Sequence, residues 1–212
     1  MDKISYTLVS EGPSDRALMP HLTWLLRQNG ISIPIESEWA DLSRVPKKPK
    51  RLVEKIKVSY ELYPCDLLFV HRDSDGQPII NRRNEIEQAV IEAFNKKNPF
   101  YVCVIPVREQ EAWLLFDENA IRRASGNPYG KVRLDLPKLN SIERIADPKI
   151  LLNNLIKEAS ELPGRHLRRL NLSHSVSQIS QNINDFTPLR KLKAFQSLEN
   201  NIQEVVNLMK TV

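Results

Sequence analysis

Cysteine and long apolar runs are both scarce in this sequence of 212 residues. Its two cysteines, Cys65 and Cys103, form no CxxC or Cys/His spacing of the kind that binds zinc, so we expect both as reduced core residues. No apolar run approaches the roughly 18 residues that span a bilayer. No N-terminal stretch has the pattern of a signal peptide. We therefore expect a cytoplasmic protein with no membrane partner.

Several motifs of phosphate and calcium chemistry are also missing. The chain contains no GxxxxGK[ST] loop, which argues against a nucleotide-hydrolysing motor. A calcium EF-hand that began at Asp73 would need glycine and glutamate where Pro78 and Asn84 stand. The DxDG at Asp73 resembles that of haloacid-dehalogenase phosphatases and of metal-binding glycosyltransferases, but the phosphatases carry a later Asp-Asp pair that this chain lacks.

The composition is otherwise that of a folded protein, with 41% hydrophobic and 27% charged residues. The formal net charge of +5 is a mild indication of a polyanionic partner. Positive side chains are concentrated between residues 44 and 57, where they suit a nucleic-acid backbone, although a solvated loop explains them equally well. The residues of this stretch that we expect to contact nucleic acid are Lys47, Lys48, Lys50 and Arg51.

Apolar patterning alternates between strand and helix along the first 125 residues. Such alternation predicts an α/β fold whose four-stranded parallel sheet is covered by helices on both faces. Beyond this point helical stripes replace strand patterns, so we divide the chain into an α/β domain over 1–125 and a helical C-terminal part over 126–212 that packs on it. The predicted strands are 3–10, 31–37, 65–71 and 100–107, and the predicted helices are 14–28, 51–62, 82–96 and 109–124.

Acidic side chains follow three of the four predicted strands. The carboxyl ends of parallel strands meet at one edge of a sheet, so these acids are expected to lie close together. Like charges at that distance repel unless protons or cations are present, and Mg²⁺ prefers oxygen ligands. Each acid alone also fits an ordinary turn or helix start. The six acids are Glu11, Asp15, Asp73, Asp75, Glu109 and Glu111, with Glu109 the weaker candidate.

Two short motifs carry a resemblance to a known superfamily. VSEGPSD at 9–15 and HRDSD at 71–75 resemble the TOPRIM domain of primases, topoisomerases, RNase M5-type nucleases and OLD-family nucleases. EGPSD is most similar to the EGxSE of the OLD type. IPVREQEAWLLFD at 105–117, together with ERIADPKILLNNL at 143–155, resembles a small bacterial TOPRIM family often encoded beside an ABC-type ATPase in loci like those of phage defence.

The resemblance implies a Rossmann-like TOPRIM fold and a role for each matched acid. Glu11 corresponds to the glutamate that does acid/base or metal work, and Asp73 and Asp75 to the metal-binding pair, so these three are the expected catalytic residues. Asp15 corresponds to the second acid of the OLD pattern, although it is shorter than glutamate. Glu111 corresponds to the acid ahead of Trp-Leu-Leu. All five are expected ligands of Mg²⁺ or Mn²⁺.

The expected function is a metal-dependent nuclease that cleaves DNA or RNA, as the effector of a phage-defence system with a partner ABC-type ATPase. Arg72, His71 and Arg108 are expected to neutralise phosphate at the same rim, with ion pairs to the neighbouring acids as the alternative. A non-catalytic regulatory or binding module remains open. A metal-dependent phosphatase or nucleotidyl-transfer enzyme remains open as well, and so does a homo-oligomeric state.

Overall fold

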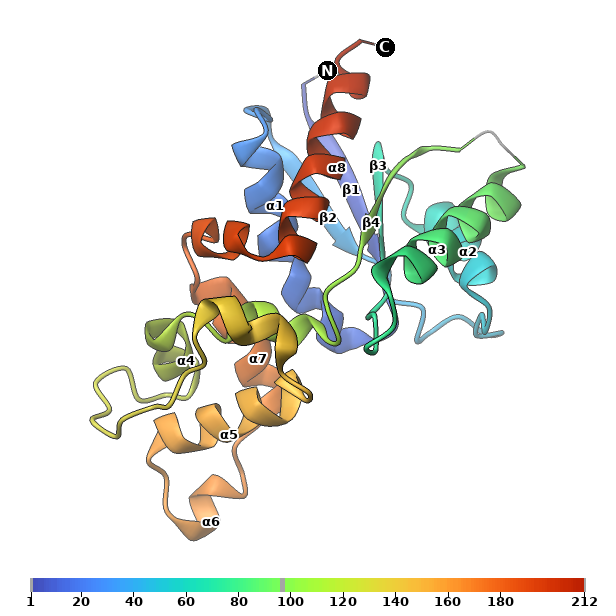
Figure 1. The fold of residues 1–212 in the computed structure, drawn as a ribbon. Helices are drawn as coiled ribbons and strands as arrows, with labels where there is room; N and C mark the ends of the chain where they lie inside the picture. The colour runs from blue at the N-terminus through green and yellow to red at the C-terminus, as the bar shows by residue number, and fades with distance from the viewer. Residues whose placement is uncertain (1, 96–97, 212) are drawn as a thin grey trace.

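A four-stranded parallel sheet forms the centre of the molecule. The computed structural model describes residues 2–95 and 98–211, and the strand order is β2-β1-β3-β4 (Figure 1). The predicted α/β class with a parallel four-stranded sheet and a helical C-terminal part is confirmed. The strands are β1 (Ile4–Val9), β2 (Ile35–Trp39), β3 (Leu67–His71) and β4 (Phe100–Val104).

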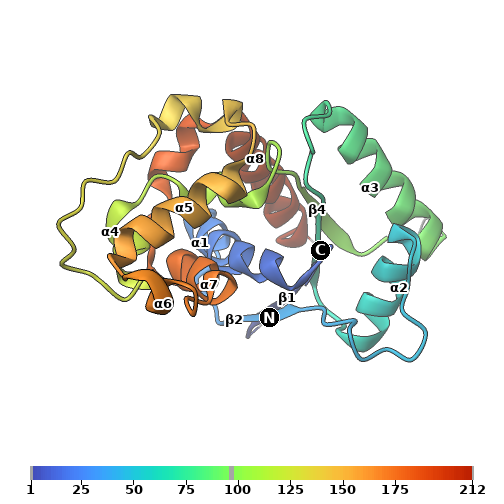
Figure 2. The same ribbon diagram turned by 90° about the horizontal axis from the view of Figure 1, so that it is seen from below.

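Helices cover both faces of this sheet. Alternate side chains of a strand point to opposite faces: Leu68 and Val70 of β3 pack toward α2 and α3, whereas Leu67 and Phe69 pack toward α1 and α8. Figure 2 shows the two pairs of helices on either side of the strands. These helices are α1 (Met19–Gln28), α2 (Leu52–Leu62), α3 (Ile79–Phe94) and α8 (Lys193–Met209).

The remaining helices extend the side of the sheet that α1 and α8 cover. One apolar core continues from the strands through Trp113, which is fully buried, to α5 and α7. No helix in the described part of the chain combines the length and the apolar character needed to cross a membrane. The further elements are η1 (Pro13–Leu18), η2 (Gln110–Leu114), α4 (Glu118–Ala124), η3 (Leu139–Arg144), α5 (Pro148–Ser160), α6 (Gly164–Leu167), α7 (Leu172–Asn182) and η4 (Thr187–Lys191).

Proline shifts several predicted boundaries, because it lacks the N–H that pairs in a ladder. The strand predicted at 31–37 begins at Ile35, directly after Pro34, and lies at the sheet edge. The strand predicted to reach residue 107 ends at Val104, before Pro106. The third helix starts at Ile79, after Pro78, and residue 96, its predicted end, lies outside the described residues.

Two predicted helices are divided. The helix predicted at 14–28 begins as the 3-10 helix η1 and becomes α-helical at Met19, with Pro20 in the first turn, where no N–H partner is required. The helix predicted at 109–124 is wrong as a single element: η2 ends at Leu114, and Asp117 starts α4 by accepting a hydrogen bond from the Ala120 N–H at 2.9 Å.

The two cysteines are free. Cys103 is buried, as predicted for a core residue, whereas Cys65 is half-buried, and the two form no disulfide with each other. Burial raises the pKa of the Cys103 thiol to about 12, and a thiol held neutral in this way is a poor nucleophile and a poor metal ligand.

Candidate functional site

The carboxyl ends of β1, β3 and β4 meet at one edge of the sheet. Val9 pairs with Val70, and His71 pairs with Val104, so the three strands end at the same level. The loops that follow carry the acids predicted from the sequence. We call five of these side chains the acid rim: Glu11, Asp15, Asp73, Asp75 and Glu111.

Backbone hydrogen bonds tie the loop after β3 to the loop after β4. The N–H groups of Ser74 and Asp75 donate to the carbonyls of Pro106 and Arg108, each at 3.2 Å. Ser74 Oγ in turn accepts from the Arg108 N–H at 2.8 Å. Asp75 and Arg108 adopt φ of 51° and 62°, the left-handed region that non-glycine residues rarely occupy. The two loops therefore act as one frame around Asp73.

Asp15 is buried and organises the turn that follows β1. Its Oδ2 accepts hydrogen bonds from the N–H groups of Glu11 and Gly12, each at 3.0 Å, and its Oδ1 accepts from Ser14 Oγ at 3.2 Å. These contacts hold the carboxylate in one orientation at the start of η1. Asp15 thus fixes the turn and at the same time brings a buried negative charge to the rim.

Asp73 lies between the other carboxylates of the acid rim. Within the described residues its Oδ1 is buried and has no hydrogen-bond partner. Burial, followed by repulsion from the four other carboxylates of the rim, raises the pKa of Asp73 to about 8. At neutral pH this side chain therefore holds a proton unless a cation replaces it.

His71, the last residue of β3, is fully buried beside Asp73. Its Nδ1 lies 3.0 Å from the Val104 carbonyl, which can only accept, so Nδ1 carries the proton and Nε2 a lone pair. Burial lowers the pKa of His71. The ring is therefore neutral at neutral pH, and its approach to Asp73 (3.5 Å) and Asp15 (3.9 Å) forms no ion pair.

A continuous series of ion pairs runs along the solvent side of the rim. Arg72 pairs with Glu11 and, at 3.1 Å, with Glu85 of α3. Glu85 also pairs with Arg82 at 2.9 Å, and Arg82 pairs with Asp75 at 2.7 Å. We call Glu11, Arg72, Glu85, Arg82 and Asp75 the arginine bridge. Glu11 and Asp75 are the two ends of this bridge, and their carboxylates pair with the guanidinium groups of Arg72 and Arg82.

Glu111 is buried on η2, and burial raises its pKa. Together with Ser14 and Lys149 it lines a cavity of about 450 Å³ between η1 and the helices α5 and α7. Glu109 turns to α5, where its Oε2 accepts from the Lys149 N–H at 3.0 Å, and Arg108 Nη1 donates to the Ala146 carbonyl at 3.4 Å. The segments 105–117 and 143–155 therefore meet beside the rim.

The predicted phosphate-binding side chains do not share one site: some line a cavity, some form ion pairs and others are exposed. Lys48 and Lys55 line a cavity of about 210 Å³ together with Glu11 and Trp39. Lys55 belongs to the basic stretch 44–57, although it was not among the four residues of that stretch expected to contact nucleic acid. Arg51 pairs with Glu92 at 3.0 Å on the surface. Lys47 and Lys50 are exposed, while Arg72 belongs to the arginine bridge.

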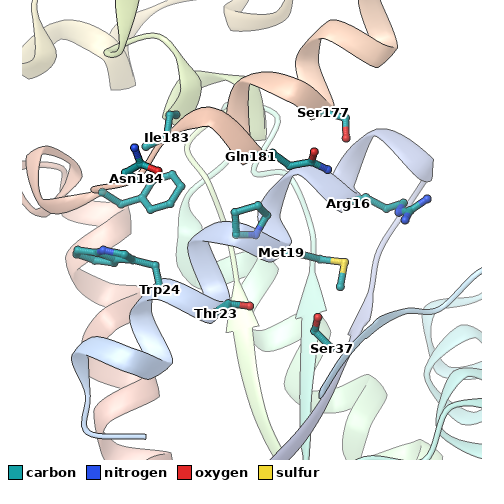
Figure 3. Close-up of a pocket in the computed structure, with 11 residues that line it drawn as sticks. Arg16, Met19, Thr23, Trp24, Ser37, Ser177, Gln181, Ile183 and Asn184 are labelled. Atoms are coloured by element: carbon teal, nitrogen blue, oxygen red, sulfur yellow. The ribbon is translucent and has the colours of Figure 1, made fainter. Parts of the chain in front are cut away.

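A further cavity of about 620 Å³ lies between η1, α1, β2 and α7. Figure 3 shows Arg16, Met19 and Trp24 on one side of it and Gln181 and Asn184 on the other. No carboxylate is found among the described residues that line it, so this cavity is unsuited to a divalent cation.

The structure brings together Asp15, Asp73, Glu111 and His71, but it holds Glu11 and Asp75 in the arginine bridge. Over residues 2–95 and 98–211, no three His, Cys, Asp or Glu side chains are grouped closely enough to hold a metal ion as they stand. Comparisons with protein-family models, with curated proteins and with solved structures find no match to this chain.

Proposed function

We propose that this protein is a Mg²⁺- or Mn²⁺-dependent nuclease whose reaction takes place at the acid rim. The observation that carries the proposal is the state of Asp73. Its carboxyl group is half-buried, and its Oδ1 is buried without a hydrogen-bond partner in the described residues. Burial and repulsion from four other carboxylates raise the pKa to about 8, so the site requires either a proton or a cation. A perturbed pKa of this kind at strand ends is typical of functional sites.

The residues fit a hard divalent cation in their chemistry. Carboxylate oxygens are the preferred ligands of Mg²⁺ and Mn²⁺, and Asp73 Oδ1 is an unpaired buried oxygen within the described structure. Asp15, Asp73 and Glu111 would hold the ion, joined by Glu11 and Asp75 once the arginine bridge opens. The chemistry that the ion supplies when bound is activation of water and stabilisation of charge on a phosphodiester.

The proposed substrate is a nucleic acid, DNA or RNA. Lys48 and Lys55 line the cavity that contains Glu11, so positive charge lies beside the acids where a phosphate would enter. Lysine contacts of this kind neutralise a phosphate backbone without reading its sequence. When the arginine bridge opens, Arg72 becomes free to pair with a phosphate oxygen.

Cleavage assays with purified protein test this proposal. Plasmid DNA and labelled RNA are incubated with Mg²⁺ or Mn²⁺, and Asp73→Asn is compared with Asp135→Asn, the same substitution on an exposed loop. We expect the wild type and Asp135→Asn to cleave, and we expect this cleavage to stop when the metal is chelated. The cleavage rate of Asp73→Asn should be lower by at least about 100-fold. Cleavage by Asp73→Asn at the wild-type rate would refute the proposal.

A matched screen separates the proposed nuclease from an enzyme of small substrates. Hydrolysis of p-nitrophenyl phosphate or of free nucleotides, without cleavage of either polymer, would identify a metal-dependent phosphatase or nucleotidyl-transfer enzyme instead.

The arginine bridge favours a second candidate function. Two carboxylates expected to bind metal are already neutralised by guanidinium groups, an arrangement that suits a non-catalytic regulatory or binding module. Such a module would bind nucleic acid with the same affinity with and without divalent cations and would cleave none. In both cases the proposed setting is phage defence with a partner ABC-type ATPase. The genes that flank the one encoding this chain test that setting, and copurification with an ABC-type ATPase found among them tests the pairing.

A further inference from the structure

The unpaired nitrogen of His71 faces two carboxylates without a hydrogen bond to either. Its Nε2 has no partner in the part of the chain that the structure describes. The separations of 3.5 Å from Asp73 Oδ1 and 3.9 Å from Asp15 Oδ2 exceed the 2.7 to about 3.2 Å of a hydrogen bond to nitrogen. A proton on His71 or on Asp73 would therefore not form a hydrogen bond between these two side chains at the observed distance.

The same separations fit two ligands of a shared ion. Metal–ligand bonds of about 2.1 Å place neighbouring ligands about 3 Å apart and opposite ligands about 4 Å apart. The observed distances of 3.5 and 3.9 Å lie between these two values, so the side chains must adjust to bind an ion, as expected where no three such groups of the described residues are close enough as they stand. The ring is also prepared for such a role, because the Val104 carbonyl fixes the Nδ1–H tautomer and aims the Nε2 lone pair at the acids.

We propose that Nε2 of His71 is a direct ligand of the divalent cation, together with the carboxylates of Asp73 and Asp15. The proposal rests on the metal dependence of the proposed function and deepens it by adding a nitrogen ligand to the carboxylates proposed there. The resulting centre has mixed nitrogen and oxygen ligands. Imidazole suits first-row transition ions, whereas Mg²⁺ demands hard oxygen ligands. The centre therefore selects Mn²⁺ over Mg²⁺.

Pulsed electron paramagnetic resonance of Mn²⁺ bound to the full-length, metal-free protein tests this ligand directly. A coordinated imidazole nitrogen produces a ¹⁴N modulation of the Mn²⁺ signal. His71→Asn keeps an amide N–H that can reach the Val104 carbonyl and removes the Nε2 position. His174→Asn, at an exposed position of α7, is the matched control.

We expect the ¹⁴N modulation in the wild type and in His174→Asn, and its loss in His71→Asn. The Mn²⁺ dissociation constant of His71→Asn should rise by at least about tenfold, with a smaller change for Mg²⁺. A second measurement needs no variant: protein grown with ¹⁵N-histidine should replace the ¹⁴N pattern by that of ¹⁵N. This labelling experiment still tests the proposal if His71→Asn does not fold.

The failures of the two proposals are distinguishable. Bound Mn²⁺ that supports cleavage but shows no histidine nitrogen would overturn the role of His71 and leave the nuclease intact. A modulation that persists in both His71→Asn and Asp73→Asn would place the ion elsewhere and would also overturn it. Absence of both Mn²⁺ binding and cleavage would remove the proposed function together with this ligand.

Discussion

The Asp73 carboxyl group makes the folded protein sensitive to pH. Its pKa rises from 3.8 to about 8 on folding, so the folded state binds one proton more than the unfolded state between these values. Without divalent cations, the contribution of this side chain to the free energy of unfolding therefore falls as pH rises from about 4 to about 8. Above about pH 8 the destabilisation is complete. A bound cation would remove the loss.

Asp73→Asn is expected to reverse this loss, because an amide stays neutral at every pH. In thermal melts without metal, the stability of the variant should match that of the wild type near pH 4. At pH 9 the variant should be more stable by an amount on the order of a few kcal/mol, and each kcal/mol raises Tm by about 2 to 4 °C. Added Mn²⁺ should stabilise the wild type alone at pH 9. A Tm difference that does not change with pH would contradict the shifted pKa.

Strand-end spacing predicted which acids meet at this edge, but it did not predict where each side chain points. Asp73 and Glu111 lie at the rim, as their positions after β3 and β4 suggested, with Glu111 buried and Asp73 half-buried. The direction of Asp75 depends on Arg82, seven residues later on α3, and no local pattern records that pairing. The sequence suggested His71 only as a phosphate contact at the rim, and the unpaired nitrogen that faces the acids is visible only in the structure.

At the scale of elements, α3 supplies the cations that compete with a metal ion. Arg82 and Arg83 are neighbours on this helix, yet Arg82 pairs with Asp75 while Arg83 donates to Ser197 and Asn201 of α8. A divalent cation must displace Arg82 to recruit Asp75. The sequence did not indicate this role, because the pairing joins two elements through their side chains.

Arg82→Gln is therefore expected to bind Mn²⁺ about 5- to 10-fold more tightly than the wild type, an effect on the order of 1 kcal/mol for one nearby charge. Arg83→Gln removes the same charge from the same helix and should change the affinity by less than about twofold. Isothermal titration of the metal-free proteins measures both. Equal effects of the two substitutions would show that Asp75 is no ligand.

The loop before α2 and the first turn of this helix form the expected path of a phosphate backbone. Lys48 and Lys55 line the cavity beside Glu11, whereas Lys57 lies about 200° further round the helix. Lys48→Gln and Lys55→Gln should each weaken nucleic-acid binding and reduce the slope of log K against log salt by about 1. Fluorescence anisotropy at several salt concentrations measures this, and an equal effect of Lys57→Gln would contradict it.

Periodicity predicted the strands and most helices because each buries one apolar face, and it failed where one polar side chain decides the backbone. The apolar stretch at 109–124 has helical spacing throughout, but Asp117 accepts the Ala120 N–H and starts a separate helix. Its capping chemistry was visible in the sequence. Aspartate occurs inside helices as well as at their starts, so the sequence pattern alone did not decide between one continuous helix and a new helix at Asp117.

At the scale of the whole molecule, the sheet and the helical C-terminal part share one core. Trp113, which follows β4, meets the ring of Phe195 on α8 edge-on, with centroids 5.2 Å apart and an interplanar angle of 86°. Both side chains are fully buried in the cluster that also contains Tyr6 of β1. The rim is therefore supported by residues from both ends of the chain.

Phe195→Ala is expected to destabilise the whole protein by about 3 to 5 kcal/mol, the usual effect of removing a buried phenyl ring. Urea unfolding followed by tryptophan fluorescence and by circular dichroism should show a single shared transition at lower urea for the variant. Two separate transitions, with only the helical part affected, would contradict a shared core.

Binding of a divalent cation at the acid rim through Asp73 underlies both proposals. The most direct measurement is an anomalous difference map from crystals soaked in Mn²⁺. We expect a peak within about 2.5 Å of the Asp73 carboxylate and of His71 Nε2, with Asp15 beside it. A map from saturated crystals with no peak at the rim would show that this site binds no divalent cation.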